Sequence, residues 1–160
     1  MDAATFGQEA MRYERLLYHI CWAMTGNDAD CADIIQEALL RAWQHRDALR
    51  SMASFRPWLC RITANTCRDL LRKRKKLKMV PLTDTLMAPP YSDDPLALRE
   101  ALAKLSPEQR TAVVLHYYDG LTIQEISESL DIPTGTVKTR LMYARRNLGQ
   151  LLREDSEVEA

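Results

Sequence analysis

The side chains with the clearest chemical potential in this 160-residue sequence are two clusters of lysine and arginine. Between residues 68 and 78, seven basic residues stand against Asp69 alone, and residues 138–146 carry four basic residues and no acidic one. The stretch from 79 to 137 is acidic, so the whole chain balances at 22 basic and 22 acidic residues. Because Lys and Arg bind polyanions, two separate clusters on a neutral chain predict two contact points with a polyanion.

Other chemistry is poorly supported by the sequence. The four cysteines include no C-x-x-C pair, and the three histidines add no zinc-like spacing beside them, so we expect reduced thiols and no metal or cofactor. A redox or metal-sensing role for a cysteine is the alternative. No glycine-rich phosphate loop and no nucleophile with a nearby base is apparent. An enzyme acting on a small-molecule substrate is therefore the least favoured class.

Helices must position both basic clusters. With 46% apolar residues, the chain can form a packed core. Apolar side chains at helical spacing predict one helix around residues 16–24 and a second over about 30–44. Residues 50–54 are expected to form a loop, and Pro57 in a first turn opens a third helix that runs into the basic tract Arg72–Lys76. That tract is expected to follow a phosphate backbone, with a solvated charge run as the alternative.

Residues 79–95 are predicted to be a flexible linker. Four prolines lie there among Thr, Ser and Asp, and no hydrophobic period is sustained. The alternative is a long surface loop within one domain, but structureless loops of this length are uncommon in compact domains.

The C-terminal part carries the pattern of a helix-turn-helix. After a short helix near 96–105, Ser106-Pro107 starts the next helix, and a capping box at Thr122 opens another that ends near Leu130. A three-residue turn leads to a last helix from Thr134 to about Leu152, followed by an acidic tail expected to fray. Two short helices joined by a tight turn, the second one basic, are typical of DNA-binding modules. A four-helix bundle with a solvated basic helix is the alternative.

In this arrangement the last helix would enter the major groove with its N-terminal side chains. The residues predicted to contact DNA there are Thr134, Thr136, Lys138, Thr139, Arg140, Met142, Tyr143, Arg145 and Arg146.

Five motifs together resemble a known family. They are Leu105-Ser-Pro-Glu-Gln-Arg110, Gly120-Leu-Thr-Ile-Gln-Glu-Ile126, the segment 132–141, the segment 33–43, and Phe55-Arg-Pro-Trp-Leu-Cys-Arg-Ile-Thr-Ala-Asn65 with Arg68-Asp-Leu-Leu-Arg72 after it. The last two motifs resemble region 2 and the first three resemble region 4 of the extracytoplasmic-function (ECF) branch of the sigma-70 family, and along the chain they stand in the family's order. The resemblance covers about residues 10–76 and 96–150.

The resemblance implies roles for individual residues. The core RNA polymerase would be bound by Asp33, Gln36, Glu37, Leu40 and Arg41. The opened −10 strand would be held by Arg50, Ser51, Met52, Ala53, Ser54, Phe55, Arg61, Asn65, Arg68 and Arg72, whereas Trp58 is expected to be a core residue rather than a stacking platform. The −35 element would be contacted by the residues of the last helix named above. An anti-sigma protein is a further expected partner.

The sequence thus predicts an all-α chain of two small helical domains joined by a flexible linker. We expect region 2 at 1–78, the linker at 79–95 and region 4, the helix-turn-helix domain, at 96–153. A cytoplasmic protein is expected because neither a signal peptide nor a long apolar stretch is present. A stand-alone helix-turn-helix regulator and a sigma mimic that titrates a regulator remain as rivals.

Overall fold

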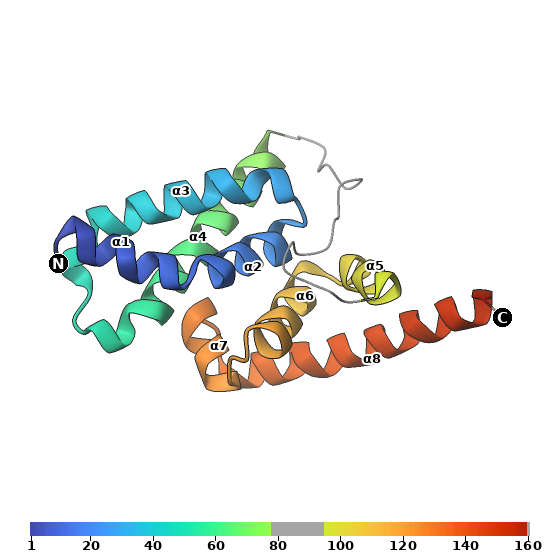
Figure 1. Ribbon diagram of the computed structural model, residues 1–160. Helices are drawn as coiled ribbons and strands as arrows, with labels where there is room; N and C mark the ends of the chain where they lie inside the picture. The colour runs from blue at the N-terminus through green and yellow to red at the C-terminus, as the bar shows by residue number, and fades with distance from the viewer. Residues whose placement is uncertain (78–94, 160) are drawn as a thin grey trace.

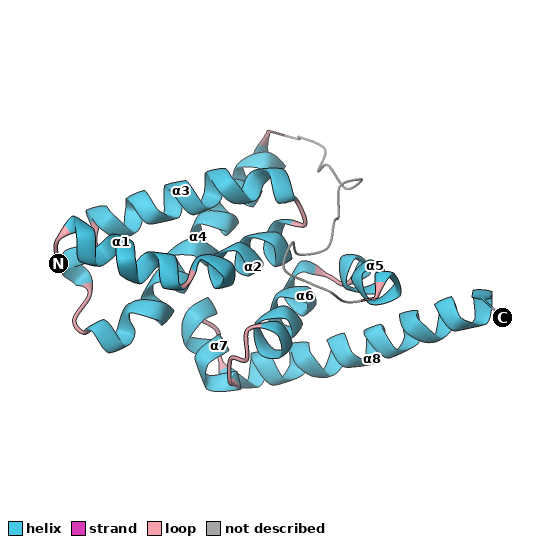
Figure 2. Ribbon diagram, viewed as in Figure 1, coloured by secondary structure: helices cyan, strands magenta, loops and turns pink. Residues whose placement is uncertain are grey.

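The computed structural model describes residues 1–77 and 95–159, with side chains up to residue 154. Within these ranges all regular structure is helical (Figure 2). The elements are α1 (Ala3–Arg12), α2 (Glu14–Thr25), α3 (Asp28–Gln44), η1 (Arg46–Ala48), η2 (Met52–Ser54), α4 (Phe55–Lys76), α5 (Leu96–Lys104), α6 (Pro107–Val113), η4 (Val114–Tyr118), α7 (Ile123–Leu130) and α8 (Thr134–Glu159). Of the predicted linker 79–95, residues 79–94 lie outside the described residues.

The first module consists of α1 to α4. Its helix boundaries follow local chemistry: Asp2 accepts a hydrogen bond from the amide of Thr5 at 2.8 Å, and Asn27 accepts from that of Ala29 at 2.9 Å. Gly26 ends α2 with φ 67°, a left-handed conformation that glycine adopts without steric cost. Ile20 and Trp22 of α2 and Leu59 of α4 are fully buried, so the core lies between these helices.

The second module consists of α5 to α8. Ser106 caps α6, and α6 continues into the π turn η4. Thr122 and Glu125 form the predicted capping box: the Glu125 amide donates to Thr122 Oγ1 at 3.1 Å, and the Thr122 amide donates to Glu125 Oε1 at 3.0 Å. Asp131 in the left-handed region (φ 57°) makes the turn between α7 and α8.

Three details differ from the sequence expectations. The helix α1 precedes the first predicted one and buries Phe6 and Ala10. Residues 50–54 include the 3₁₀ turn η2 rather than only irregular loop. The helix α8 extends to Glu159, where a frayed tail was expected after Arg153.

The two modules pack against each other. The closest approaches between them are α4 against α7 and α2 against α6. In Figure 1, α7 lies beside the helices of the first module, while the C-terminal half of α8 extends away from them.

Candidate functional site

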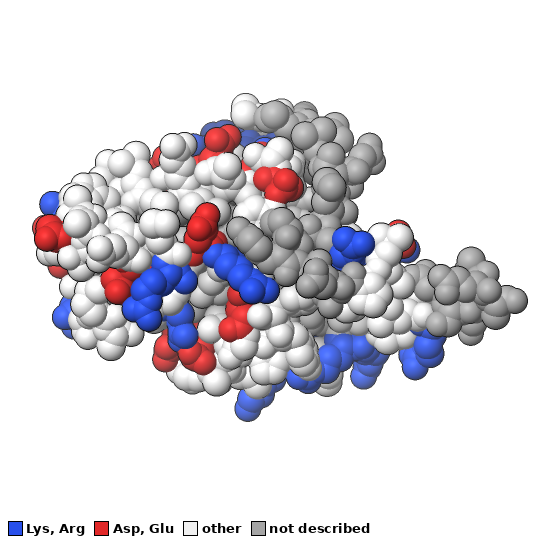
Figure 3. Space-filling model, in the orientation of Figure 1, with Lys and Arg blue, Asp and Glu red and all other residues white. Residues whose placement is uncertain are grey.

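The first surface is the exposed side of α8. Val137, Leu141 and Ala144 are buried at a spacing of four and three residues, so this stripe anchors α8 to its module. The opposite side leaves the following predicted DNA-contacting residues exposed: Lys138, Thr139, Met142, Tyr143, Arg145 and Arg146. Thr134, Thr136 and Arg140 are half-buried at its margin. Figure 3 shows basic side chains along the outer edge of α8.

Tyr117 supports this surface from the π turn η4. Arg145 donates from Nε to the Tyr117 hydroxyl at 2.5 Å, and its guanidinium lies 5.5 Å from the centre of the Tyr117 ring. Arg146 lies at the same distance from the ring of Tyr143. Tyr117 was not foreseen from the sequence, because a π turn and its contact with α8 leave no periodic signal.

The second surface is the outer side of α3. Asp33, Gln36, Glu37 and Leu40 are exposed at helical spacing, and Leu40 keeps 51% of its area accessible. A single exposed leucine is common on protein surfaces, so the assignment of this surface to polymerase binding depends on the resemblance. Here the structure brings together the residues for which the resemblance implied polymerase binding.

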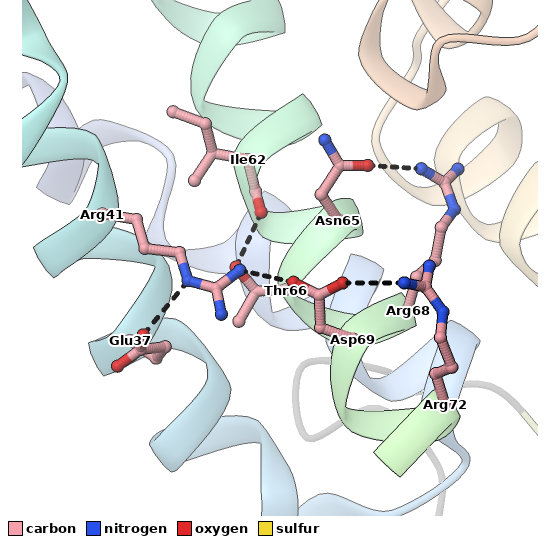
Figure 4. A network of polar contacts seen from close by, with 8 residues as sticks. All are labelled: Glu37, Arg41, Ile62, Asn65, Thr66, Arg68, Asp69 and Arg72. Atoms are coloured by element: carbon pink, nitrogen blue, oxygen red, sulfur yellow. Dashed lines mark hydrogen bonds and ion pairs between the residues drawn. The ribbon is translucent and has the colours of Figure 1, made fainter. Parts of the chain in front are cut away.

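Arg41 joins α3 to α4 in a polar network (Figure 4). It donates from Nε to Glu37 at 3.1 Å and from a terminal nitrogen to Asp69 Oδ2 at 2.8 Å. The hydrogen bond to Asp69 is the main reason that the pKa of Arg41 is raised, so the guanidinium is always charged. Asp69 also pairs with Arg72 at 3.7 Å. Asp69 was missed as a site residue, although a single acid within a basic tract was a usable signal.

The third surface is the predicted −10 region. Arg50 to Ser54 form an exposed segment, in which Ser51 Oγ accepts from the amide of Ala53 at 3.2 Å and Met52 is 48% exposed. Arg61 and Arg68 of α4 are half-buried, and Asn65 is exposed and accepts from Arg68 at 2.8 Å.

Phe55 lies inside the first module, unlike the other residues predicted for the −10 region. It is fully buried, with ring centres 5.9 Å from Phe6 and 5.8 Å from Trp58, and its place beside the −10 strand stays a prediction. The aromatic cluster explains the burial, since edge contacts among large rings add to their apolar packing. Trp58 is half-buried and packs against this core.

The basic tract at the end of α4 is largely solvent-exposed. Arg72, Lys73, Lys75 and Lys76 are exposed, whereas Arg74 is tied to Asp30 of α3 by an ion pair. The tract thus offers Lys73, Lys75 and Lys76 as exposed cations, together with Arg72, which pairs with Asp69.

The cysteines lie in the interior. The neighbouring thiols of Cys31 and Cys67, together with burial, raise the pKa of Cys21. In the described parts of the chain, no group of three or more Cys, His, Asp and Glu side chains could hold a metal ion. Over the same residues, no helix is both long and apolar enough to cross a membrane.

Comparison with known proteins matches both modules. Residues 10–77 match the family model of Sigma-70 region 2, and residues 96–148 match that of Sigma-70 region 4. The ECF RNA polymerase sigma factor SigL of Mycobacterium tuberculosis is 36% identical over 148 residues, covering 87% of this chain and 84% of SigL. SigW of Bacillus subtilis, another ECF sigma factor, is 33% identical over 174 residues, covering 96% of this chain and 91% of SigW.

Solved structures agree in fold. The structure of CnrH in complex with the cytosolic domain of CnrY has a TM-score of 0.69 at 26% identity and covers 96% of this chain and 91% of that one. The sigma factor RpoE of Bartonella quintana, crystallised with the anti-sigma factor NepR, has a TM-score of 0.78 at 24% identity, with 93% and 97% covered.

The fold and its exposed surfaces define a two-module helical transcription factor built from sigma regions 2 and 4. More particularly, the chain belongs to the ECF sigma factors of the sigma-70 family. It is therefore an initiation factor that binds core RNA polymerase and directs it to promoters. Sigma factors as a class are non-enzymatic.

Proposed function

We propose that this sigma factor divides promoter recognition among the three surfaces described above. Asp33, Gln36, Glu37, Leu40 and Arg41 bind the polymerase; the segment 50–54, Arg61, Asn65, Arg68 and Arg72 hold the opened −10 strand; and the exposed side of α8 contacts the −35 element. Region 2 occupies 1–78 and region 4 occupies 96–153, joined by the linker 79–95. The chain itself catalyses nothing, and it acts in the cytoplasm, where the polymerase is.

The observation that carries the proposal is the division of α8 into two sides. Every third or fourth residue is buried in the module core, and the intervening Lys, Arg, Thr, Met and Tyr side chains face outward. A helix with this distribution fits the major groove, in which Lys and Arg neutralise phosphates and shorter side chains contact base edges.

The −10 assignment is supported by the chemistry of α4. A strand leaving a duplex must be met by cations that track its phosphates and by a pocket for a displaced base. The exposed segment 50–54 lies next to the start of α4, and Arg61, Asn65 and Arg68 follow on this helix at spacings of four and three residues.

An anti-sigma protein is a further proposed partner. The matching RpoE of Bartonella quintana was crystallised with the anti-sigma factor NepR, and the matching CnrH structure is a complex with the cytosolic domain of CnrY. The exposed Leu40 and its polar neighbours give a regulator a surface on which it would compete with the polymerase.

The proposal is tested by separating polymerase binding from promoter binding. Fluorescently labelled protein is titrated with bacterial core RNA polymerase without DNA, and Asp33→Ala or Glu37→Ala is expected to weaken saturable binding. Lys138→Ala with Arg140→Ala should abolish promoter choice and leave polymerase binding intact. Loss of both activities by the α8 variant would contradict the division between modules. Failure of the unchanged protein to bind polymerase at micromolar concentration, with DNA binding retained, would favour a stand-alone regulator.

A further inference from the structure

The outward side of α8 has a central line of three uncharged residues, Gly135, Thr139 and Met142. Each of them stands two positions before a residue of the buried stripe that anchors the helix. Because two positions turn an α-helix by about 200°, the central line lies opposite the side that packs on the module. All three residues are exposed, and Met142 keeps 46% of its area accessible.

The chemistry of the central line is apolar. The hydroxyl of Thr139 donates to the carbonyl oxygen of Gly135 at 2.9 Å, so the one hydrogen that this side chain could donate to a base is used within the helix. Its methyl group remains for a partner. Met142 follows with a flexible thioether that is neither a strong donor nor a strong acceptor. These residues belong to the first three turns of α8, and the N-terminal part of a recognition helix is the part that reaches base edges.

The cations of α8 stand beside or beyond the central line. The one arginine of the first three turns is Arg140, which is half-buried at the margin of the outward side. Lys138 is exposed on the other flank. Arg145 and Arg146 follow the third turn, and each guanidinium lies 5.5 Å from the centre of a tyrosine ring. This distribution suits the phosphates on both sides of a groove, whereas guanine is most often read by an arginine that reaches O6 and N7 with two donors.

Thymine is the base that fits an apolar line. In the major groove, adenine, guanine and cytosine are distinguished by nitrogen and oxygen atoms, and thymine alone adds an apolar group, its C5-methyl. Covering one methyl group corresponds to about a fourfold gain in affinity. Two such contacts would therefore be enough to select among promoter sequences.

We propose that Thr139 and Met142 read the promoter through the C5-methyl groups of thymine, while the cations beside them hold the phosphates. The inference rests on the proposed contact of α8 with the −35 element, and it names the base and the chemical group that this helix selects. The competing assignment is readout of guanine by Lys138, which depends on O6 and N7 and not on a methyl group.

The experiment removes the methyl group from the DNA. The full chain bound to core RNA polymerase selects duplexes from a random-sequence pool. The segment contacted by α8 is located by footprinting as the one whose protection is lost with Lys138→Ala and Arg140→Ala together. Each thymine of this segment is then replaced singly by uracil, which pairs with adenine in the same way and lacks only the methyl group. At one or more positions, we expect the replacement to weaken binding about fourfold.

Two variants remove the matching groups from the protein. Thr139→Ser deletes the methyl group and keeps the hydroxyl that bonds to Gly135, and Met142→Ala deletes the thioether. We expect each variant to bind the thymine duplex about fourfold more weakly and to lose the effect of uracil at one position. Met11→Ala is the matched control, because this methionine is 73% exposed on α1. It should retain the full effect of uracil at every position.

The outcomes separate the inference from the assignment on which it rests. Equal binding of thymine and uracil duplexes by the unchanged protein, or a selected segment without thymine, would overturn the inference and leave the −35 assignment standing. Retention of the full uracil effect in both Thr139→Ser and Met142→Ala would assign the methyl contact to other residues and overturn it as well. If the double replacement of Lys138 and Arg140 leaves every protected segment unchanged, the −35 assignment itself fails, and the inference falls with it.

Discussion

Asp69 connects the surface proposed to bind polymerase with the surface proposed to bind the −10 strand. Its carboxylate holds Arg41, which belongs to the α3 surface, and Arg72, which belongs to the proposed −10 surface. Since these side chains are partly exposed, each ion pair contributes little to stability, about 0.2–1 kcal/mol. Its importance is geometric, because the pair fixes the direction in which Arg41 points.

Replacing Asp69 should therefore affect polymerase binding indirectly, through Arg41. We expect Asp69→Ala to weaken polymerase binding by roughly two- to fivefold, because Arg41 loses its 2.8 Å partner and becomes mobile. The measurement is anisotropy of the labelled protein titrated with core polymerase. Asp47→Ala, an exposed aspartate outside α3 and α4, is the control. Unchanged affinity in the Asp69 variant would show that Arg41 needs no positioning.

Tyr117 should position Arg145 without supplying charge. Tyr117→Phe removes the hydroxyl that accepts from Arg145, and we expect binding to mixed-sequence duplex DNA to weaken about two- to fivefold. Because no cation is lost, the dependence of log K on log salt concentration should keep its slope. Arg145→Gln should reduce the magnitude of that slope by about 0.9. A changed slope in the tyrosine variant would refute a purely positioning role.

At the scale of single elements, α7 and α8 were the most predictable part. The capping box at Thr122 and the turn at Asp131 act within four residues, so the sequence contains all that determines them. Helix α1 was not predicted because its ten residues bury only Phe6 and Ala10, a pattern too sparse to detect. The π turn η4 was also not predicted, since it depends on packing and on the hydrogen bond from His116 Nδ1 to the carbonyl oxygen of Leu121.

The capping box predicts a pH dependence of stability. The backbone amide of Thr122 lowers the pKa of Glu125 below its ordinary value of 4.5, with Arg56 adding to the effect. A carboxylate with a lowered folded-state pKa stabilises the fold above the ordinary value, and this contribution is lost as pH falls below it. We expect the free energy of unfolding, measured with urea between pH 6 and about 3, to fall less steeply below pH 4.5 for Glu125→Gln than for the unchanged protein.

The control for this experiment lies on the same helix. Glu128 accepts from the Gln124 side chain at 3.1 Å rather than from a helix-terminal amide. Glu128→Gln should therefore retain the slope of the unchanged protein. Parallel curves for all three proteins would mean that Glu125 contributes nothing through its charge.

For the whole molecule, the sequence predicted the parts but not their packing. The helices of both modules follow from hydrophobic periodicity and capping signals, and their assignment to regions 2 and 4 follows from the resemblance of their motifs. The exposed residues of α3 and α8 follow from their helical spacing. The contacts that join the modules could not be predicted in this way. Arg61, Arg68 and Arg110 bind backbone carbonyls, and because every residue has a carbonyl, the sequence does not indicate which one an arginine will bind. Phe55 illustrates the same limit: its motif implied a surface role, but only the assembled aromatic cluster shows that it is buried.

The packing of α7 against α4 should be visible in the reactivity of the Cys60 thiol. Burial raises the pKa of this thiol to about 12, so it should react slowly with N-ethylmaleimide at pH 8. Ser129→Gln places a longer side chain at a fully buried position of α7, which packs against α4, and should loosen this contact. In this variant we expect the modification rate of Cys60 to rise at least tenfold, as peptide mass spectrometry would report. Cys21 should stay unmodified in both proteins because its neighbours belong to the first module alone. Equally rapid modification of Cys60 in the unchanged chain would argue against a buried contact.

The π turn η4 has a consequence for how relatives of this chain should be aligned. Within Val114–Tyr118, each turn of helix takes in one residue more than an α-helix would. A relative one residue shorter at this place would continue as an ordinary α-helix, and the side chains of this turn, including the one at 117, would be placed differently. The aromatic ring beneath Arg145 would then point elsewhere. We therefore expect single-residue gaps at 114–118 to coincide with loss of the tyrosine at 117, of the arginine at 145, or of both.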